Sequence, residues 1–152
     1  MTEAANIRRL FLDPRPSYPL PEVAKLVDLE VKELKARIQA GELEPDDVGQ
    51  IPWAEVISFA MDLWSQQVVE AALGADVAKA IPALLRLTEL EVRIPRLEVV
   101  ALERVAARDG RAVDAVLARE LLDFVSAHAE WLGGEIPGFA EALAWPHSIP
   151  GA

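Results

Sequence analysis

The sequence Thr88-Glu89-Leu90-Glu91-Val92-Arg93-Ile94-Pro95 is the most informative segment for the fold of the second half of this chain. Polar and apolar residues alternate along it, and this period of two is typical of a β-strand. A lone strand leaves its backbone N–H and C=O groups unpaired, so the stretch needs a partner strand. Because the other strand-like segment, 44–51, is weak, we expect residues 90–94 to pair with their own copy in a homodimer.

Helical spacing begins after Pro95 and continues in two segments separated by Asp109-Gly110. Apolar residues recur three or four positions apart in both segments: Leu97, Val100, Ala101, Leu102 and Val105 in the first, and Val113, Val116, Leu117, Leu121 and Val125 in the second. The second half therefore reads as strand, helix, glycine turn and helix.

This order over residues 89–128 resembles the ribbon-helix-helix family of DNA-binding proteins. The resemblance implies a homodimer built on an intermolecular antiparallel ribbon that enters the major groove. By position, the dimer interface takes in the apolar side chains Leu90, Val92, Ile94, Leu102, Val116 and Leu117. The groove-facing residues are then Glu89, Glu91 and Arg93, and Arg111 in the turn is a phosphate contact.

Prolines and glycines divide the first half of the chain. Four prolines between residues 13 and 21 predict an extended lead-in, and a helix begins at Pro21, where a missing N–H costs nothing. A second helix runs from about residue 31 to Gly41, a polar loop or short hairpin covers 42–52, and a third helix extends from Trp53 to about Leu73.

Residues 18–61 resemble the winged helix-turn-helix of MerR-like and excisionase-like proteins. The matching sequence is Leu20-Pro21-Glu22-Val23-Ala24-Lys25-Leu26-Val27 for the first helix, with Ala40-Gly41-Glu42-Leu43 and Val48-Gly49-Gln50-Ile51-Pro52-Trp53 around the wing. The resemblance implies that residues 30–40 form the recognition helix. Its DNA-facing side chains are then Lys32, Lys35 and Arg37.

The predicted fold class is mainly α. We expect an extended lead-in (1–17), a degenerate winged helix-turn-helix (18–74), a connecting helix (75–88), a ribbon-helix-helix dimerisation domain (89–128) and an apolar tail (129–152). The tail carries Trp131, Ile136, Phe139, Leu143 and Trp145. It either folds back over the dimer module or binds another protein.

Composition excludes several classes of function. The 152 residues contain no cysteine, so disulfides, thiol nucleophiles and Cys-ligated zinc are excluded. His128 and His147 lack a metal-ligand spacing or a paired nucleophile, so we predict no enzyme, no metal and no cofactor. No apolar run has the length of a membrane helix, and the first nine residues contain no signal-like stretch. We therefore expect a cytoplasmic protein of bacterial type.

The function predicted from these resemblances is a homodimeric DNA-binding regulator of transcription, of the kind found among antitoxin-like autorepressors. Its partners are double-stranded DNA and a second copy of itself. The net charge of −10 opposes binding to phosphates, and the predicted wing Glu42-Leu43-Glu44-Pro45-Asp46-Asp47 is acidic. The alternative is an acidic protein-interaction module that keeps both folds and has lost DNA binding.

Overall fold

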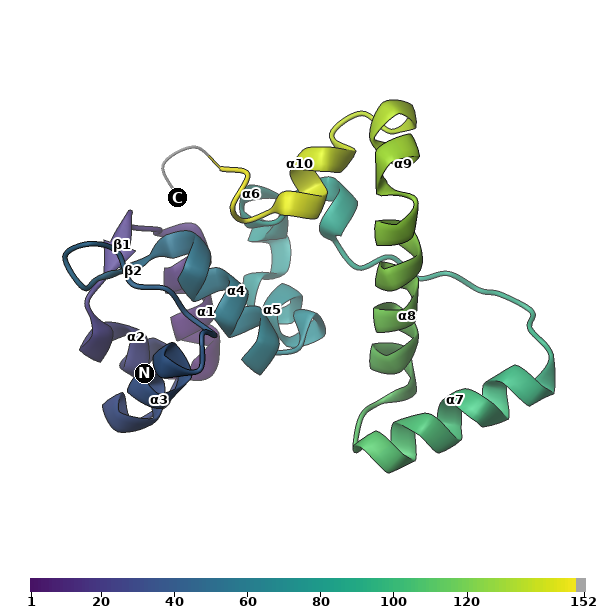
Figure 1. The fold of residues 1–152 in the computed structure, drawn as a ribbon, viewed down its shortest axis with the longest axis horizontal. Coiled ribbons are helices and arrows are strands. Elements are labelled where there is room, and N and C mark those ends of the chain that lie inside the picture. Colours follow the sequence, from purple (N-terminus) through teal and green to yellow (C-terminus); the bar gives the residue numbers. More distant parts are fainter. Residues whose placement is uncertain (150–152) are drawn as a thin grey trace. The chain divides into compact units, whose positions relative to one another are not determined.

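The structure is a computed structural model that describes residues 1–149. It is mainly helical, with one small antiparallel sheet (Figure 1). The chain divides into two compact units: the N-terminal unit combines Met1–Leu87 with the residues from Glu141 onward, and the second unit is Thr88–Ala140. None of the helices in the described part of the chain is long and apolar enough to cross a membrane.

The N-terminal unit is a helical cluster with a two-stranded sheet at its edge. Its elements are α1 (Glu3–Leu12), β1 (Ser17–Tyr18), α2 (Leu20–Leu26), α3 (Val31–Gln39), β2 (Ile51–Pro52), α4 (Trp53–Leu63), α5 (Gln66–Leu73) and α6 (Val77–Ala80), with 3-10 turns η1 (Gly74–Asp76) and η2 (Ala83–Leu85). The strands pair antiparallel, with Ser17 opposite Pro52 and Tyr18 opposite Ile51. This pairing connects the proline-rich segment 13–21 to the end of the loop 42–50, which is rich in Asp and Glu and is called the acidic loop below.

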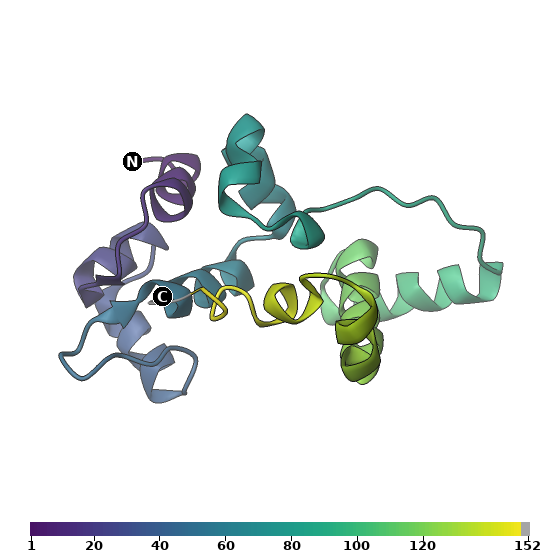
Figure 2. The same ribbon diagram turned by 90° about the horizontal axis from the view of Figure 1, so that it is seen from above.

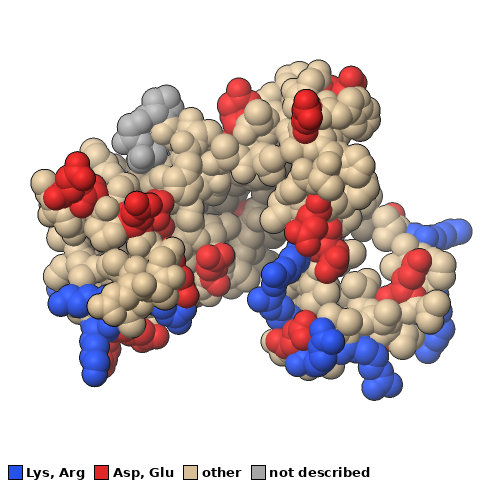
Figure 3. All heavy atoms as spheres, viewed as in Figure 1, with Lys and Arg blue, Asp and Glu red and all other residues tan. Residues whose placement is uncertain are grey.

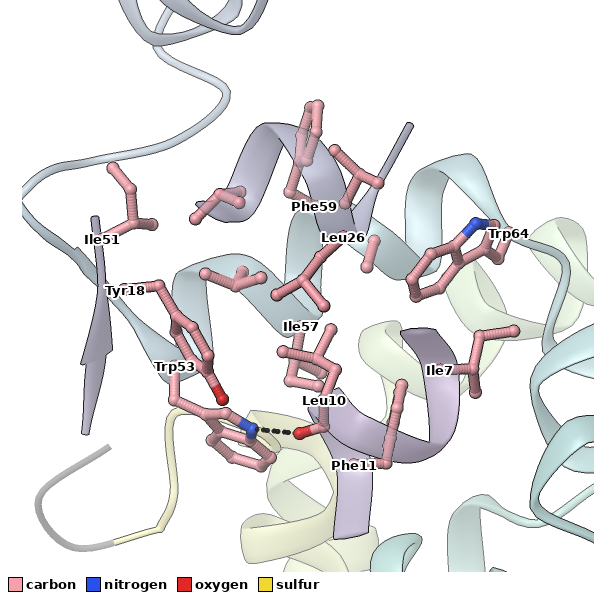
Figure 4. Packing of buried hydrophobic residues seen from close by; sticks show 14 of the residues in the cluster. Ile7, Leu10, Phe11, Tyr18, Leu26, Ile51, Trp53, Ile57, Phe59 and Trp64 are labelled. Carbon is pink, nitrogen blue, oxygen red and sulfur yellow. Dashed lines mark hydrogen bonds between the residues drawn. The ribbon is translucent and has the colours of Figure 1, made fainter. Parts of the chain in front are cut away.

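The core of this unit is built around α1 and α4. Figure 4 shows Leu10 of α1 between Tyr18, Trp53 and Ile57, all of which are buried. The Trp53 indole N–H donates to the Leu10 carbonyl at 3.0 Å, so the ring is buried without an unsatisfied donor. The helix after the loop is thereby joined to the first helix of the chain.

The extended lead-in predicted for residues 1–17 is wrong over most of its length. Residues 3–12 form α1, whose first turn is capped by the Thr2 hydroxyl, which accepts from the Ala5 N–H at 3.2 Å. Ile7 and Leu10 are completely buried. The helical spacing of Ile7 and Leu10 is a weak signal beside the four prolines that follow, which predict extended backbone only from about residue 13 onward.

The predicted single helix from Trp53 to Leu73 is two helices. The backbone is extended at Trp64 and Ser65, and the Ser65 hydroxyl caps α5 by accepting from the Val68 N–H at 3.3 Å. The break turns α5 onto α1, where Val69 and Leu73 are buried. The predicted connecting helix, 75–88, is also wrong as one element, because only α6 and two 3-10 turns form there.

The second unit contains α7 (Arg96–Asp109), α8 (Val113–Ala127) and α9 (Ala129–Glu135), and α10 (Phe139–Ala144) crosses its C-terminal boundary. Helix α7 ends at Gly110, which adopts a left-handed conformation (φ +64°). A glycine in this conformation is the helix end that the sequence predicted after Asp109. Among the apolar side chains of this unit, only Ala106 of α7 and Val116 of α8 are buried. By itself the unit has very little core.

Residues 88–95 form neither helix nor strand in the single chain. In both ribbon views the segment runs extended, and no helix of the same unit lies alongside it (Figures 1 and 2). Leu90 is 81% exposed, Val92 53% and Ile94 41%. The alternating segment therefore has no partner strand among residues 1–149, and its pairing across a dimer stays a prediction.

The tail was predicted to fold over the dimer module or to bind another protein. Its described residues from Glu141 to Ile149 instead belong to the N-terminal unit, while residues 129–140 belong to the second unit. The Trp145 ring stacks on Phe11 with centroids 6.5 Å apart and meets Trp53 edge-on at 6.4 Å. His147 Nε2 lies 3.0 Å from Glu55 Oε1. Trp131 of the tail remains 64% exposed.

Candidate nucleic-acid interface

Helices α2 and α3 are joined by a short turn that fixes their relative orientation. Asp28 adopts a left-handed conformation (φ +55°), and the Leu29 N–H donates to the Ala24 carbonyl at 2.9 Å. Leu34, in the centre of α3, is completely buried and joins the helix to the core. The rest of α3 is exposed or half-buried, so the helix presents one face to solvent.

Lys32 and Lys35 lie on the exposed part of α3. Within residues 1–149, neither side chain makes an ion pair or a hydrogen bond. Figure 3 shows Lys and Arg side chains at the end of the N-terminal unit that carries α3, with Asp and Glu side chains both beside them and elsewhere on that face. Two of the predicted DNA-binding residues are therefore cations with no carboxylate partner.

Arg37, the third predicted residue of this helix, is in a different situation. Its guanidinium lies 3.1 Å from Glu42 Oε2 and 3.8 Å from Glu33 Oε1. The side chain is half-buried. Its charge is thus neutralised locally, and it is less available to phosphate than the two lysines.

The loop between α3 and β2 is ordered by its own hydrogen bonds. The Asp46 carboxylate accepts from the Val48 N–H at 3.0 Å and from the Gln50 N–H at 2.9 Å. Gly49 takes a positive φ of 79°, which a residue with a Cβ rarely adopts. Leu43 is buried beneath the loop. The acidic side chains of the loop are exposed: Glu42, Glu44, Asp46 and Asp47.

Lys25 on α2 is a further exposed cation that the sequence analysis did not single out. It stands between Ala24 and Leu26, both of which are buried in the core. The helical spacing of the apolar residues in α2 is the signal in the sequence that would have predicted an exposed side chain at position 25.

The predicted groove-facing residues of the second unit lie on the extended segment. Glu89, Glu91 and Arg93 are all exposed. None of the three makes an ion pair or a hydrogen bond with any residue in the described range 1–149. Of the predicted dimer residues, Leu102 and Leu117 are half-buried and Val116 is already buried between α7 and α8.

Arg111 lies exposed in the turn between α7 and α8, where its backbone N–H donates to the Ala106 carbonyl at 2.9 Å. The neighbouring Asp109 pairs with Arg108, with Nε and Oδ1 2.9 Å apart. The Arg108 guanidinium is the main cause of a lowered pKa at Asp109, and Arg111 and Arg119 add to it. The Asp109 carboxylate at the end of α7 is thus influenced by three guanidinium groups, those of Arg108, Arg111 and Arg119.

The structure brings the two predicted sets of DNA-binding residues into separate units: Lys32, Lys35 and Arg37 in the N-terminal unit, and Glu89, Glu91, Arg93 and Arg111 in the second. No group of three or more His, Asp or Glu side chains suited to a metal ion occurs among residues 1–149. Comparison with protein-family models, curated proteins and solved structures gives no match to this chain.

Proposed function

We propose that the protein is a DNA-binding regulator of transcription that acts as a homodimer, with α2 and α3 serving as a helix-turn-helix. The observation that carries this proposal is the exposed face of α3, where Lys32 and Lys35 have no carboxylate partner in the described residues. The net charge of −10 repels DNA phosphates as a whole, so a DNA contact requires a local group of cations that are not neutralised by carboxylates. The exposed face of α3 provides such cations.

The second unit supports the dimer. Its extended segment exposes Leu90, Val92 and Ile94 in alternation, and its helices bury little apolar surface within one chain. Pairing of this segment with its copy would satisfy the backbone groups and remove these side chains from water. A dimer would also present two copies of α3 to two half-sites on DNA.

The experiment is capture of sheared genomic DNA by the purified protein at low and at physiological salt, followed by sequencing of the bound fragments. We expect a few fragments to remain enriched at physiological salt, and a promoter sequence among them would serve as the operator for quantitative binding. Lack of enrichment at both salt concentrations, from a folded dimer, would overturn the proposal.

The role of α3 is tested on a captured fragment with the double variant Lys32→Gln and Lys35→Gln. We expect each lost phosphate contact to lower the salt dependence of the binding constant by about one unit of slope. The matched control removes the same amount of charge elsewhere, at Lys79 and Arg104. Equal losses in the two double variants would show that net charge, and not α3, determines binding.

A second function is favoured by the acidic loop. Glu42, Glu44, Asp46 and Asp47 lie outward beside α3, and Glu42 is also one of the two carboxylates that hold Arg37. An acidic module of this kind could bind a basic protein surface instead of DNA. Failure of the genomic capture would favour this function, and the next experiment would then be affinity purification of a protein partner at low salt.

A further inference from the structure

The polar face of the extended segment 88–95 contains charges of both signs that have no ion-pair partner among residues 1–149. Glu89, Glu91 and Arg93 alternate with the apolar residues, so all three lie on the face opposite to Leu90, Val92 and Ile94. All three are exposed, and none makes an ion pair within the described residues. No backbone hydrogen bond holds residues 89–94 to any other part of residues 1–149.

Antiparallel pairing of this segment with its own copy leaves few ways to align the strands. With the two-fold axis at Val92, each of the three apolar residues faces an apolar residue, and Arg93 faces the partner's Glu91. With the axis at Glu91, Leu90 faces the partner's Val92 and Arg93 faces the partner's Glu89, but the two Glu91 carboxylates face each other, which is unfavourable. An axis at Arg93 is unfavourable for the same reason, because it sets the two guanidinium groups against each other. The axis at Val92 is therefore the favoured alignment.

We propose that Arg93 is a dimer-pairing residue, which forms a cross-strand ion pair with a glutamate of a second copy of this chain and so determines self-recognition and strand register. This inference rests on the homodimer of the proposed function. The apolar face supplies the free energy of association, and the charges select the partner, because directly opposed charges of like sign destabilise a strand pair.

The inference also decides which element contacts DNA. Each strand contributes two carboxylates and one guanidinium, so the paired polar face has four negative and two positive charges. With both guanidinium groups neutralised across the ribbon, the remaining charge on this face is negative and repels phosphate. DNA contact therefore belongs to α3, and removal of the Arg93 charge leaves the DNA affinity of the assembled dimer unchanged within about twofold.

The register is tested by disulfide trapping, for which the absence of native cysteine makes the chain well suited. Variants Val92→Cys and Glu91→Cys are oxidised and run on non-reducing gels. A residue on the two-fold axis faces its own copy at about 4.5–5.5 Å between Cα atoms, within disulfide reach. We expect Val92→Cys to form a covalent dimer much faster than Glu91→Cys and faster than the control Arg104→Cys on the exposed side of α7.

The pairing is tested by charge reversal and sedimentation. The Arg93→Glu variant and the double variant Glu89→Arg with Glu91→Arg each create like-charged ribbons, so we expect the dimer dissociation constant of each to rise at least about tenfold. Mixed together, the two variants should form a heterodimer with nearly the parent affinity in either register. The control Arg104→Glu makes the same change of charge outside the segment and should leave dimerisation unchanged.

The outcomes separate this inference from the proposed function. A parent protein that remains monomeric at all concentrations overturns the homodimer, and the inference with it. A parent dimer whose dissociation constant is unaffected by both charge reversals, or whose reversed variants do not form a heterodimer when mixed, overturns the inference alone. Disulfide trapping and sedimentation do not require DNA. They therefore test the ribbon pairing even if the protein does not bind DNA.

Discussion

The Arg37 guanidinium lies 3.1 Å from the Glu42 carboxylate, at the point where α3 passes into the acidic loop. This contact withdraws one of the three cations of α3 and leaves Lys32 and Lys35 exposed. The charge available to a DNA phosphate at this helix therefore depends on the loop that follows it.

Replacement of Glu42 by Gln should increase DNA affinity. The change removes a carboxylate beside α3 and weakens the hold on Arg37, so we expect a gain of about threefold to tenfold at low salt, measured by fluorescence anisotropy on a captured fragment. The control Asp62→Asn removes one negative charge from an exposed position on α4. A gain of equal size in both variants would mean that only the net charge matters.

Removal of the Trp145 ring should destabilise the N-terminal unit. The ring contacts Phe11 and Trp53, so Trp145→Ala is expected to lower the free energy of unfolding in urea by about 2 kcal/mol. Trp131→Ala is the matched control, because that side chain is 64% exposed, and its effect should stay below about 0.5 kcal/mol. The opposite ranking would contradict the packing of the tail on this unit.

Loss of the Ser65 hydroxyl should weaken the start of α5. Its acceptance from the Val68 N–H satisfies one of the free donors at the helix N-terminus, so Ser65→Ala should cost about 1 kcal/mol in urea unfolding. Ser58→Ala lies in the interior of α4 and should change stability little or improve it slightly. Equal effects would argue for a continuous helix between Trp53 and Leu73.

Stability should depend on pH through Glu22. An ion pair with Arg15, strengthened by Arg9 at 2.8 Å, lowers the pKa of this carboxyl below its ordinary value. The charged form is therefore favoured by folding, so its contribution is complete above the unfolded-state pKa and is lost as pH falls through the lower folded-state pKa.

The measurement is urea unfolding of the parent and Glu22→Gln at several pH values. The parent should be the more stable at pH 7, and the difference should shrink as pH falls below the unfolded-state pKa of about 4.3 and through the lower folded-state pKa, because the carboxyl becomes protonated first in the unfolded and then in the folded protein. A difference that is constant over this range would show that the ion pair adds nothing to stability.

A charge on the apolar face of the extended segment should dissociate the dimer without unfolding the N-terminal unit. Val92→Asp places a carboxylate among the residues predicted to pair, and we expect sedimentation of a monomer where the parent is a dimer. Leu84→Asp makes the same type of change at another exposed apolar side chain and should not alter sedimentation. A folded Val92→Asp protein that sediments like the parent would exclude the intermolecular strand.

Features controlled by local backbone chemistry could be predicted directly from the amino-acid sequence. Gly41 and Gly110 both have the positive φ expected at a helix end, and the helical spacing after Pro95 gave α7 and α8. The buried Leu34 and exposed Lys32 and Lys35 also follow from the period of α3. These features depend on residues within a turn or two of one another.

Tertiary structure alone decided the contacts between distant residues. Tyr18 pairs with Ile51 in a strand of two residues, too short to leave a period in the sequence, and Trp145 meets Phe11 from the other end of the chain. Helix α4 ends before Trp64, and the break allows α5 to pack Val69 and Leu73 against α1. Each of these contacts depends on burial against residues far away along the chain. Burial of apolar surface is favourable and non-directional, so the sequence near a residue does not specify which distant element will cover it.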